Sequence, residues 1–125
     1  MAEVINIPAT EDTPAIRLDA GKGQIEISGK ALPEDSLAFF KPVYEWLNEY
    51  YQSPLNSTEL HLRLDYINSA STRHLFNIIS GMQDLIDKQM NAKVIWHCKS
   101  SDEMMKTKGE ELQSIVDIPF EIKEV

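Results

Sequence analysis

Hydrophobic and polar residues alternate along several short stretches of this chain. The alternation is clearest at 59–66, where Leu60, Leu62 and Leu64 fall on one side and polar residues on the other, as expected of a strand with one buried face. Weaker alternation predicts further strands at 15–19, 24–28, 92–98 and 119–125. Because the turn-forming run Gly-Lys-Gly lies at 21–23, the first two strands are expected to form a β-hairpin.

Three other segments have the spacing of amphipathic helices. The most regular is 71–90, whose apolar residues recur at steps of three and four. A second helix is expected at 101–116, and another begins around 32–36 and runs to about residue 51. Pro42 lies inside this first helix, and we expect a kink there because proline lacks the N–H donor.

The first helix is apolar on two neighbouring sides. Its two stripes are Leu37, Phe40, Tyr44, Leu47 and Tyr51, and Phe39, Val43, Trp46 and Tyr50. We interpret them as one wide surface that faces the core and has aromatic edges, because aromatic stripes usually pack. A partner-binding surface is the alternative.

These elements follow the order β-β-α-β-α-β-α-β. Strands that alternate with helices predict parallel pairing, whereas the hairpin adds antiparallel pairing, so the fold class is α/β with a mixed sheet. The clean alternation at 59–66 indicates that one sheet face is poorly covered, with the helices mainly on the other. A chain of 125 residues suits a single domain, in which 1–14 is a loose end or an edge strand.

Charge and cysteine content exclude several classes of protein. The formal net charge is −8, which repels phosphate backbones and anionic lipid, so no nucleic-acid partner is expected. There is no apolar segment long enough for membrane insertion. The single cysteine, Cys98, cannot form an internal disulfide, and we expect a cytoplasmic protein.

A search for catalytic or cofactor-binding patterns finds little. His61, His74 and His97 are scattered without metal-ligand spacing, and there is no glycine-rich nucleotide-binding loop. We therefore expect no metal and no cofactor. One alternative is a small enzyme that uses Asp65, His61 or His97 on the polar face of the sheet. Another is a constitutive binding module with a cavity under the first helix.

The junction between strand 59–66 and the following helix concentrates polar chemistry. Hydroxyl and amide side chains gather there, with basic Arg73 behind them, in the run Asn68, Ser69, Ala70, Ser71, Thr72 and Arg73. Ser71 or Thr72 is expected to cap the helix, and Asn68 to shape the turn. Because a helix N-terminus attracts anions, a phosphate added to one of these hydroxyls would be stabilised there.

The same junction carries a resemblance to a known family. The matching blocks are 64–71 (Leu-Asp-Tyr-Ile-Asn-Ser-Ala-Ser), 29–33, 39–47, 94–96, 101–104, 109–110 and 118–120. Together they make the chain similar to the SiaC family of small bacterial regulatory phosphoproteins. That resemblance implies a STAS-like fold and no catalysis. It also implies a protein whose unphosphorylated form binds and activates a diguanylate cyclase, with a partner kinase and phosphatase, in control of cyclic-di-GMP and biofilm formation.

The resemblance also implies a phosphorylation site. The family's acceptor follows the asparagine of a Tyr-Phe-Asn-Thr-Ser-Ser-like motif, which corresponds to Ser69, with Ser71 as the alternative. This chain departs from that motif by Ile67 for Phe, Ser69 for Thr and Ala70 for Ser. The expected switch surface is 68–73, and phosphorylation is expected to release the partner.

Overall fold

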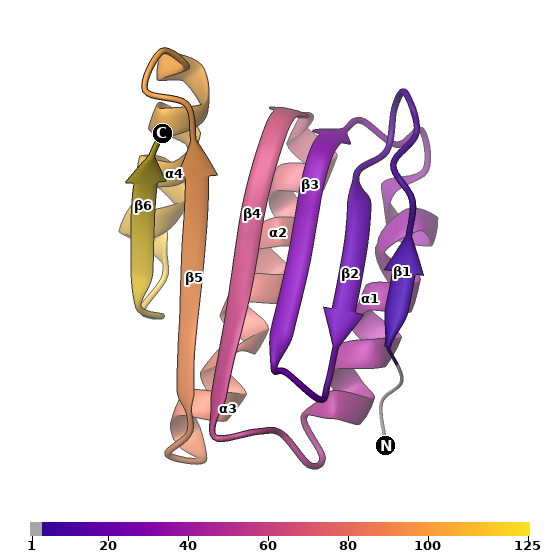
Figure 1. Ribbon diagram of the computed structural model, residues 1–125, viewed down its shortest axis with the longest axis vertical. Coiled ribbons are helices and arrows are strands. Elements are labelled where there is room, and N and C mark those ends of the chain that lie inside the picture. Colours follow the sequence, from indigo (N-terminus) through magenta and orange to yellow (C-terminus); the bar gives the residue numbers. More distant parts are fainter. Residues whose placement is uncertain (1–3) are drawn as a thin grey trace.

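The computed structural model describes residues 4–125 and contains six strands and four helices (Figure 1). In chain order they are β1 (Ile5–Ile7), β2 (Ala15–Asp19), β3 (Gln24–Ala31), α1 (Ser36–Tyr50), β4 (Ser57–Ile67), α2 (Ser69–Gly81), α3 (Gln83–Asp87), β5 (Asn91–Cys98), α4 (Glu103–Ile115) and β6 (Phe120–Glu124).

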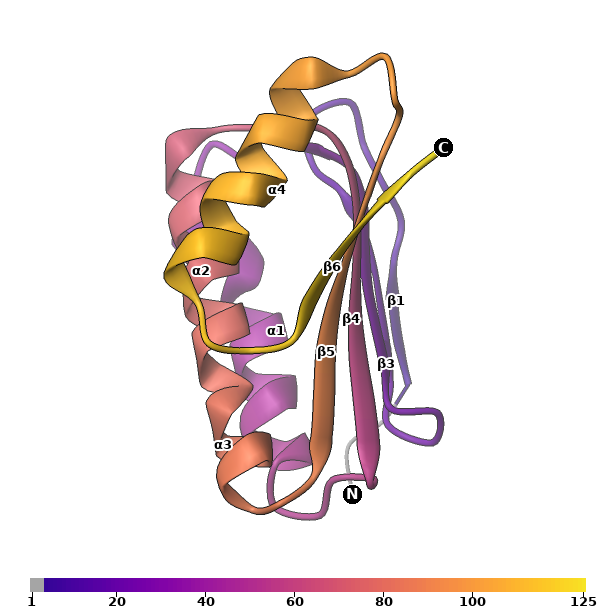
Figure 2. The same ribbon diagram turned by 90° about the vertical axis from the view of Figure 1, so that its left-hand side faces the viewer.

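The strands lie in one sheet in the same order as in the chain, β1 to β6. Pairing is antiparallel from β1 to β3 and parallel from β3 to β6, which confirms the predicted mixed sheet. Figure 2 shows the helices on one side of the sheet, as expected, and leaves the other side uncovered. Within the segment 1–14, β1 forms an edge strand, while residues 1–3 lie outside the described residues.

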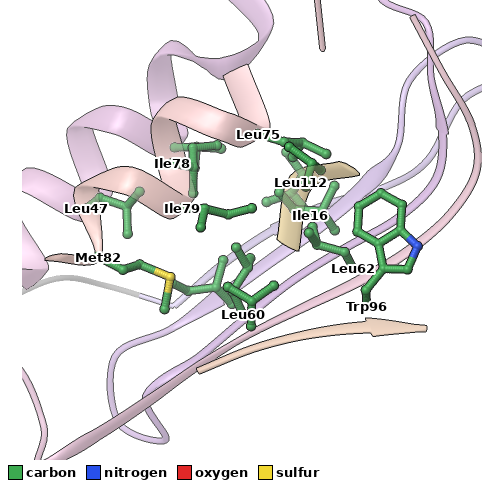
Figure 3. Packing of buried hydrophobic residues seen from close by; sticks show 14 of the residues in the cluster. Ile16, Leu47, Leu60, Leu62, Leu75, Ile78, Ile79, Met82, Trp96 and Leu112 are labelled. Carbon is green, nitrogen blue, oxygen red and sulfur yellow. The ribbon is translucent and has the colours of Figure 1, made fainter. Parts of the chain in front are cut away.

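The core fills the space between the sheet and the helices. Leu60 and Leu62 of β4 are fully buried there and pack with residues of α2 such as Ile79 (Figure 3). From α1 the fully buried side chains are Phe40 and Val43, one from each predicted stripe. Residues of both stripes therefore face the core, whereas Leu37, at the start of the first stripe, is 65% exposed.

The helix expected at 71–90 is interrupted, and its predicted bounds are wrong. It begins at Ser69 and ends at Gly81, and the short α3 follows. The N–H of Met82 bonds to the carbonyl of Ile79 (3.0 Å), a tighter step than the four-residue step of an α-helix. Gly81 disfavours helix continuation because it has no side chain and a flexible backbone. In α1, by contrast, the helix continues through Pro42.

The neighbouring strands β4 and β5 separate at the end of the sheet where the parallel strands finish. The β4–β5 register runs from Ser57 and Asn91 to Leu62 and Trp96. Beyond that point the recorded pairing of β4 is with β3, and that of β5 is with β6. Figure 1 shows β4 and β5 diverging there.

Two local features accompany this split. A β-bulge shifts the β3–β4 register between Gly29 and Lys30, and bulges bend a strand and increase its twist. On the other side, the indole Nε1 of Trp96 donates to the carbonyl of Met105 (2.9 Å), which ties β5 to α4.

Candidate functional site

The polar junction lies where β4 ends and α2 begins. One residue, Asn68, separates the two elements. Its backbone N–H donates to the carbonyl of Ala31 at the end of β3 (3.1 Å). The start of α2 is therefore fixed directly to the sheet.

Asn68 is the N-cap of α2. Its Oδ1 accepts a hydrogen bond from the N–H of Ser71 (2.8 Å), and its carbonyl accepts from the N–H (2.9 Å) and Oγ1 (3.0 Å) of Thr72. The expectation that Ser71 or Thr72 caps the helix is wrong, because the helix starts two residues earlier. An asparagine side chain caps as well as a serine or threonine, and here it takes that position.

The predicted site residues divide between two sides of the helix. Ser69, Ala70 and Arg73 are exposed, whereas Ser71 is fully buried and its Oγ has no hydrogen-bond partner. The sequence carried a signal for this division, because Ser71 lies four residues before buried Leu75 and so belongs to the core-facing stripe.

An anion would be stabilised at the exposed side of this turn. The first N–H groups of a helix have no intrahelical partner, and the N-terminal end of the helix carries a partial positive charge. Ser69 is the first residue of the 13-residue α2. Arg73 follows it by four residues, the separation at which two side chains on a helix face each other.

A hydrogen bond that the sequence did not predict connects α2 to α1. The hydroxyl of Tyr44 and Nδ1 of His74 are 2.6 Å apart, and the His74 ring stacks on Phe40 with 5.2 Å between ring centroids. Burial raises the pKa of Tyr44, partly offset by its hydrogen bond to Asn77. The second turn of α2 is thereby held against α1.

The uncovered face of the sheet carries a chain of polar side chains. Glu59 Oε1 lies 3.0 Å from His61 Nε2, and His61 Nδ1 lies 3.0 Å from His97 Nε2. Hydrogen bonds from Gln24 and His61 lower the pKa of Glu59. The pKa of His97 is lowered, first by burial and then by the positive charges of Arg63 and neighbouring groups. Within residues 4–125 no group of three or more metal-ligating side chains is placed to hold a metal ion.

A cleft of about 530 Å³ opens where β4 and β5 separate. It brings together two of the three residues considered for catalysis, Asp65 and His97, while His61 is not among its lining residues. The other lining residues are Arg63, Leu64, Tyr66, Cys98, Lys99, Asp102, Met104 and Val125. Sequence reasoning missed this cleft, although Gly29 opposite β4 marked the bulge beside it.

The remaining alternative required a cavity under the first helix. Phe40, Val43 and Leu47 fill the space between α1 and the sheet, each at most 3% exposed.

Across the described part of the chain, no helix is long and apolar enough to cross a membrane.

Comparisons with known proteins agree with one another. The sequence model for the SiaC family regulatory phosphoproteins matches residues 7–125. An uncharacterised protein of Pseudomonas aeruginosa strain UCBPP-PA14 is 28% identical over 119 residues, which cover 95% of this chain and 94% of that protein.

Solved structures show the same architecture. SiaC of Pseudomonas aeruginosa superimposes with a TM-score of 0.89 at 26% identity, covering 98% of this chain and 99% of that one. SiaC from the same organism, solved in complex with the diguanylate cyclase SiaD that it activates, gives a TM-score of 0.90 at 27% identity, covering 97% and 99% of the two chains.

Proposed function

This chain belongs to the SiaC family of regulatory phosphoproteins, and we propose that it is a phosphorylation-controlled activator of a diguanylate cyclase. It is a regulatory protein rather than an enzyme. In the proposed cycle the unphosphorylated form binds and activates the cyclase, and phosphorylation of Ser69 releases it. The partnership is inferred from SiaC, which has been solved bound to the cyclase SiaD and matches almost the whole chain.

The observation that carries the choice of acceptor is the opposite exposure of two serines on one helical turn. Ser69 is exposed, whereas the side chain of Ser71 is fully buried among core residues. A kinase must bring the acceptor hydroxyl to a nucleotide, which Ser71 permits only if α2 leaves the sheet. This supports Ser69 as the acceptor over the alternative Ser71.

The local structure tolerates a phosphate at Ser69. The phosphate would lie at the positive end of α2, beside N–H groups of the first turn. Arg73, exposed and four residues along the helix, is positioned to pair with it. Phosphorylation should therefore stabilise the start of α2, so partner release does not depend on unfolding.

Release instead follows from charge at the interface. A phosphate adds about −1.5 to −2 to a chain whose net charge is already −8. Exposed apolar side chains at the same end of the sheet, Leu37 in the first turn of α1 and Tyr66 at the end of β4, are 65% and 57% exposed. We assign these two side chains to the docking surface, where a neighbouring phosphate would have to lose its hydration shell on binding.

The rest of the cycle follows from this assignment. The proposed partners are a cognate serine/threonine kinase, a phosphatase and the cyclase, so the switch would control cyclic-di-GMP and biofilm behaviour. Because a kinase needs ATP, we place the cycle in the cytoplasm. We also treat the chain as one domain, with 68–73 as the switch surface.

The experiment compares three variants for binding to a full-length diguanylate cyclase from the same organism. By isothermal titration calorimetry, Ser69→Ala should bind as tightly as the unmodified chain, while Ser69→Asp should bind at least roughly tenfold more weakly, equivalent to about 1.4 kcal/mol. Ala70→Asp adds the same charge one residue away and tests whether the effect depends on position. Wild-type affinity in Ser69→Asp would contradict the proposed release.

Site mapping tests the acceptor separately. Intact-mass and peptide analysis of protein from its native host should find phosphate on Ser69. Ser71→Ala should still be phosphorylated, whereas Ser69→Ala should not. Phosphate on Ser71 alone would overturn this assignment.

A further inference from the structure

The cleft between β4 and β5 has the size and position of a ligand site. Its volume is about 530 Å³, within the range of roughly 300–1,000 Å³ for small-molecule pockets. It lies at the carboxyl ends of the parallel strands β4 and β5, where the chain leaves each strand for a helix. It is also built into the sheet, because it opens where the β4–β5 register stops at Leu62 and Trp96.

Two cations lie on opposite walls of this cleft. Arg63 comes from β4 and Lys99 directly follows β5. Arg63 is 47% exposed and contacts Glu26 through one nitrogen at 3.4 Å, which leaves further guanidinium donors. For Lys99 no ion pair is found with any residue in 4–125.

The surroundings of His97 also indicate positive charge on this side. After burial, the charges of Arg63, His61 and Lys123 lower its pKa, and Glu121 alone among the acting charges opposes them. At Cys98, which also lines the cleft, burial and then nearby carboxylates raise the pKa. The positive surroundings are therefore local to His97 and Arg63, and an anionic group is favoured there.

The carboxylates of the cleft are placed differently. Asp102 Oδ1 accepts from the N–H of Met105 (3.1 Å) and caps α4. Asp65 is exposed on β4 and lines the cleft as well. The cleft is therefore not uniformly cationic, and it selects for a ligand with one anionic group rather than for a polyanion.

Apolar side chains supply the remaining contact surface. Tyr66, Met104 and Val125 are 57%, 66% and 80% exposed, and all three line the cleft together with buried Leu64. Large apolar side chains that gather at one exposed concavity typically mark a binding site. The phenol ring and the thioether suit a flat apolar group.

We infer that the β4/β5 cleft binds a small organic anion with a flat apolar body, its charge held between Arg63 and Lys99 and its body lying against Tyr66, Leu64 and Met104. This site shares Tyr66 with the proposed docking surface, but none of the switch residues 68–73 lines it. It is tested on the chain alone, so its failure would leave the proposed control of a cyclase untouched.

The test uses naphthalene-2-sulfonate as the probe, titrated into the full chain and followed by ¹H–¹⁵N correlation spectra. Saturable shifts should appear at 63–66, 97–99 and Met104. Sulfate and 2-naphthol serve as comparison probes with the charge or the ring alone, and each should bind more weakly. Shifts that do not saturate, or that scatter over the helices, would overturn the inference, as would equal binding of either comparison probe.

Variants that each remove one positive charge test whether Arg63 and Lys99 hold the anionic group. Arg63→Gln and Lys99→Gln should each weaken the probe roughly tenfold, the loss expected for a hydrogen bond to a charged group. Lys41→Gln removes the same charge from exposed α1 and should leave the affinity within about twofold. Because Arg63 and Lys99 are exposed, the variants should fold, which their spectra report directly. Equal affinity in all three variants would refute the role of the cations.

Discussion

Asn68 holds the start of α2 through Ser71: its Oδ1 accepts the Ser71 N–H at 2.8 Å while the Ser71 hydroxyl is buried without a partner. The backbone of Ser71 is thus used by the cap, and its side chain faces the core. Ser69, between the two, faces outward. The capped turn therefore leaves the Ser69 side chain exposed and that of Ser71 buried.

Removing the cap should loosen this turn. Asn68→Ala leaves the Ser71 N–H without its acceptor, and the free energy of unfolding should fall by about 1 kcal/mol, the usual loss for an N-cap. Urea unfolding followed by circular dichroism measures it. Asn68→Asp keeps an acceptor at the same position and favours the helix dipole, so its stability should remain near that of the wild type. A loss in Asn68→Asp equal to that in Asn68→Ala would contradict the capping role.

The elements that follow from local patterns were predictable from the sequence. The alternation around Leu60 and Leu62 identified β4, because period-two burial is a direct consequence of strand geometry. The mixed sheet with helices on one face followed from the order of elements. What periodicity could not give is the point at which α2 ends, since apolar spacing continues past Gly81 into α3 and the change to tighter turns depends on backbone geometry.

The candidate site was predictable in part. Clustered hydroxyls marked the turn at which α2 begins, and the four-residue spacing to Leu75 was an unused signal that Ser71 lies on the buried side. The cap was misassigned because asparagine, serine and threonine are near-equivalent at that position. The cleft could not be predicted, because it arises where the pairing of β4 with β5 stops at Leu62 and Trp96, and the alternation within a single strand does not show where its pairing with a neighbour ends.

The contact between α4 and β5 gives a second prediction. A Cβ at Gly109 would lie 2.6 Å from the ring of Trp96, closer than real contacts allow. Gly109→Ala should therefore lower the free energy of unfolding by about 1–3 kcal/mol, as overpacked cores do, measured by urea titration. At Gly81 a Cβ meets nothing within 4 Å, so Gly81→Ala should stabilise, by up to about 1 kcal/mol. If both substitutions change the free energy of unfolding equally, helix propensity rather than packing against Trp96 determines the effect of Gly109→Ala.

Two tyrosines of the first helical segment form a matched pair for a third prediction. Tyr44→Phe removes the hydroxyl that contacts His74 Nδ1 at 2.6 Å, and the free energy of unfolding should fall by about 1 kcal/mol. The Tyr51 hydroxyl is buried without a partner, and burial raises the pKa of this group. Tyr51→Phe should therefore leave stability unchanged or increase it. Thermal unfolding of both variants at one pH tests this contrast. A loss of stability in Tyr51→Phe as large as that in Tyr44→Phe would refute it.

The polar chain on the uncovered sheet face predicts how stability changes with acid. Burial and nearby positive charges hold the pKa of His97 below its usual 6.5, so below about pH 6.5 the unfolded chain takes up a proton that the folded chain resists. Stability contributed by neutral His97 is complete above that pH and is lost as the pH falls. The pKa of Glu59 is lowered from 4.5 by hydrogen bonds from Gln24 and His61. Its contribution is present above pH 4.5 and is lost as the pH falls through the lowered value.

His97→Gln separates the loss of stability caused by His97 from the loss caused by Glu59. The wild type should lose melting temperature between pH 7.5 and pH 5, and His97→Gln should lose less over the same interval, because glutamine takes up no proton. Below pH 4.5 both proteins should destabilise in parallel, since Glu59 is retained. His74→Gln, on the helical side of the sheet, is the control for removing a histidine without touching this chain of side chains. The effect is modest because the sheet face is open to solvent, so the measured quantity is the difference in melting temperature between the two pH values. If the melting temperature of His97→Gln falls as much as that of the wild type between pH 7.5 and pH 5, His97 does not cause the loss over that interval.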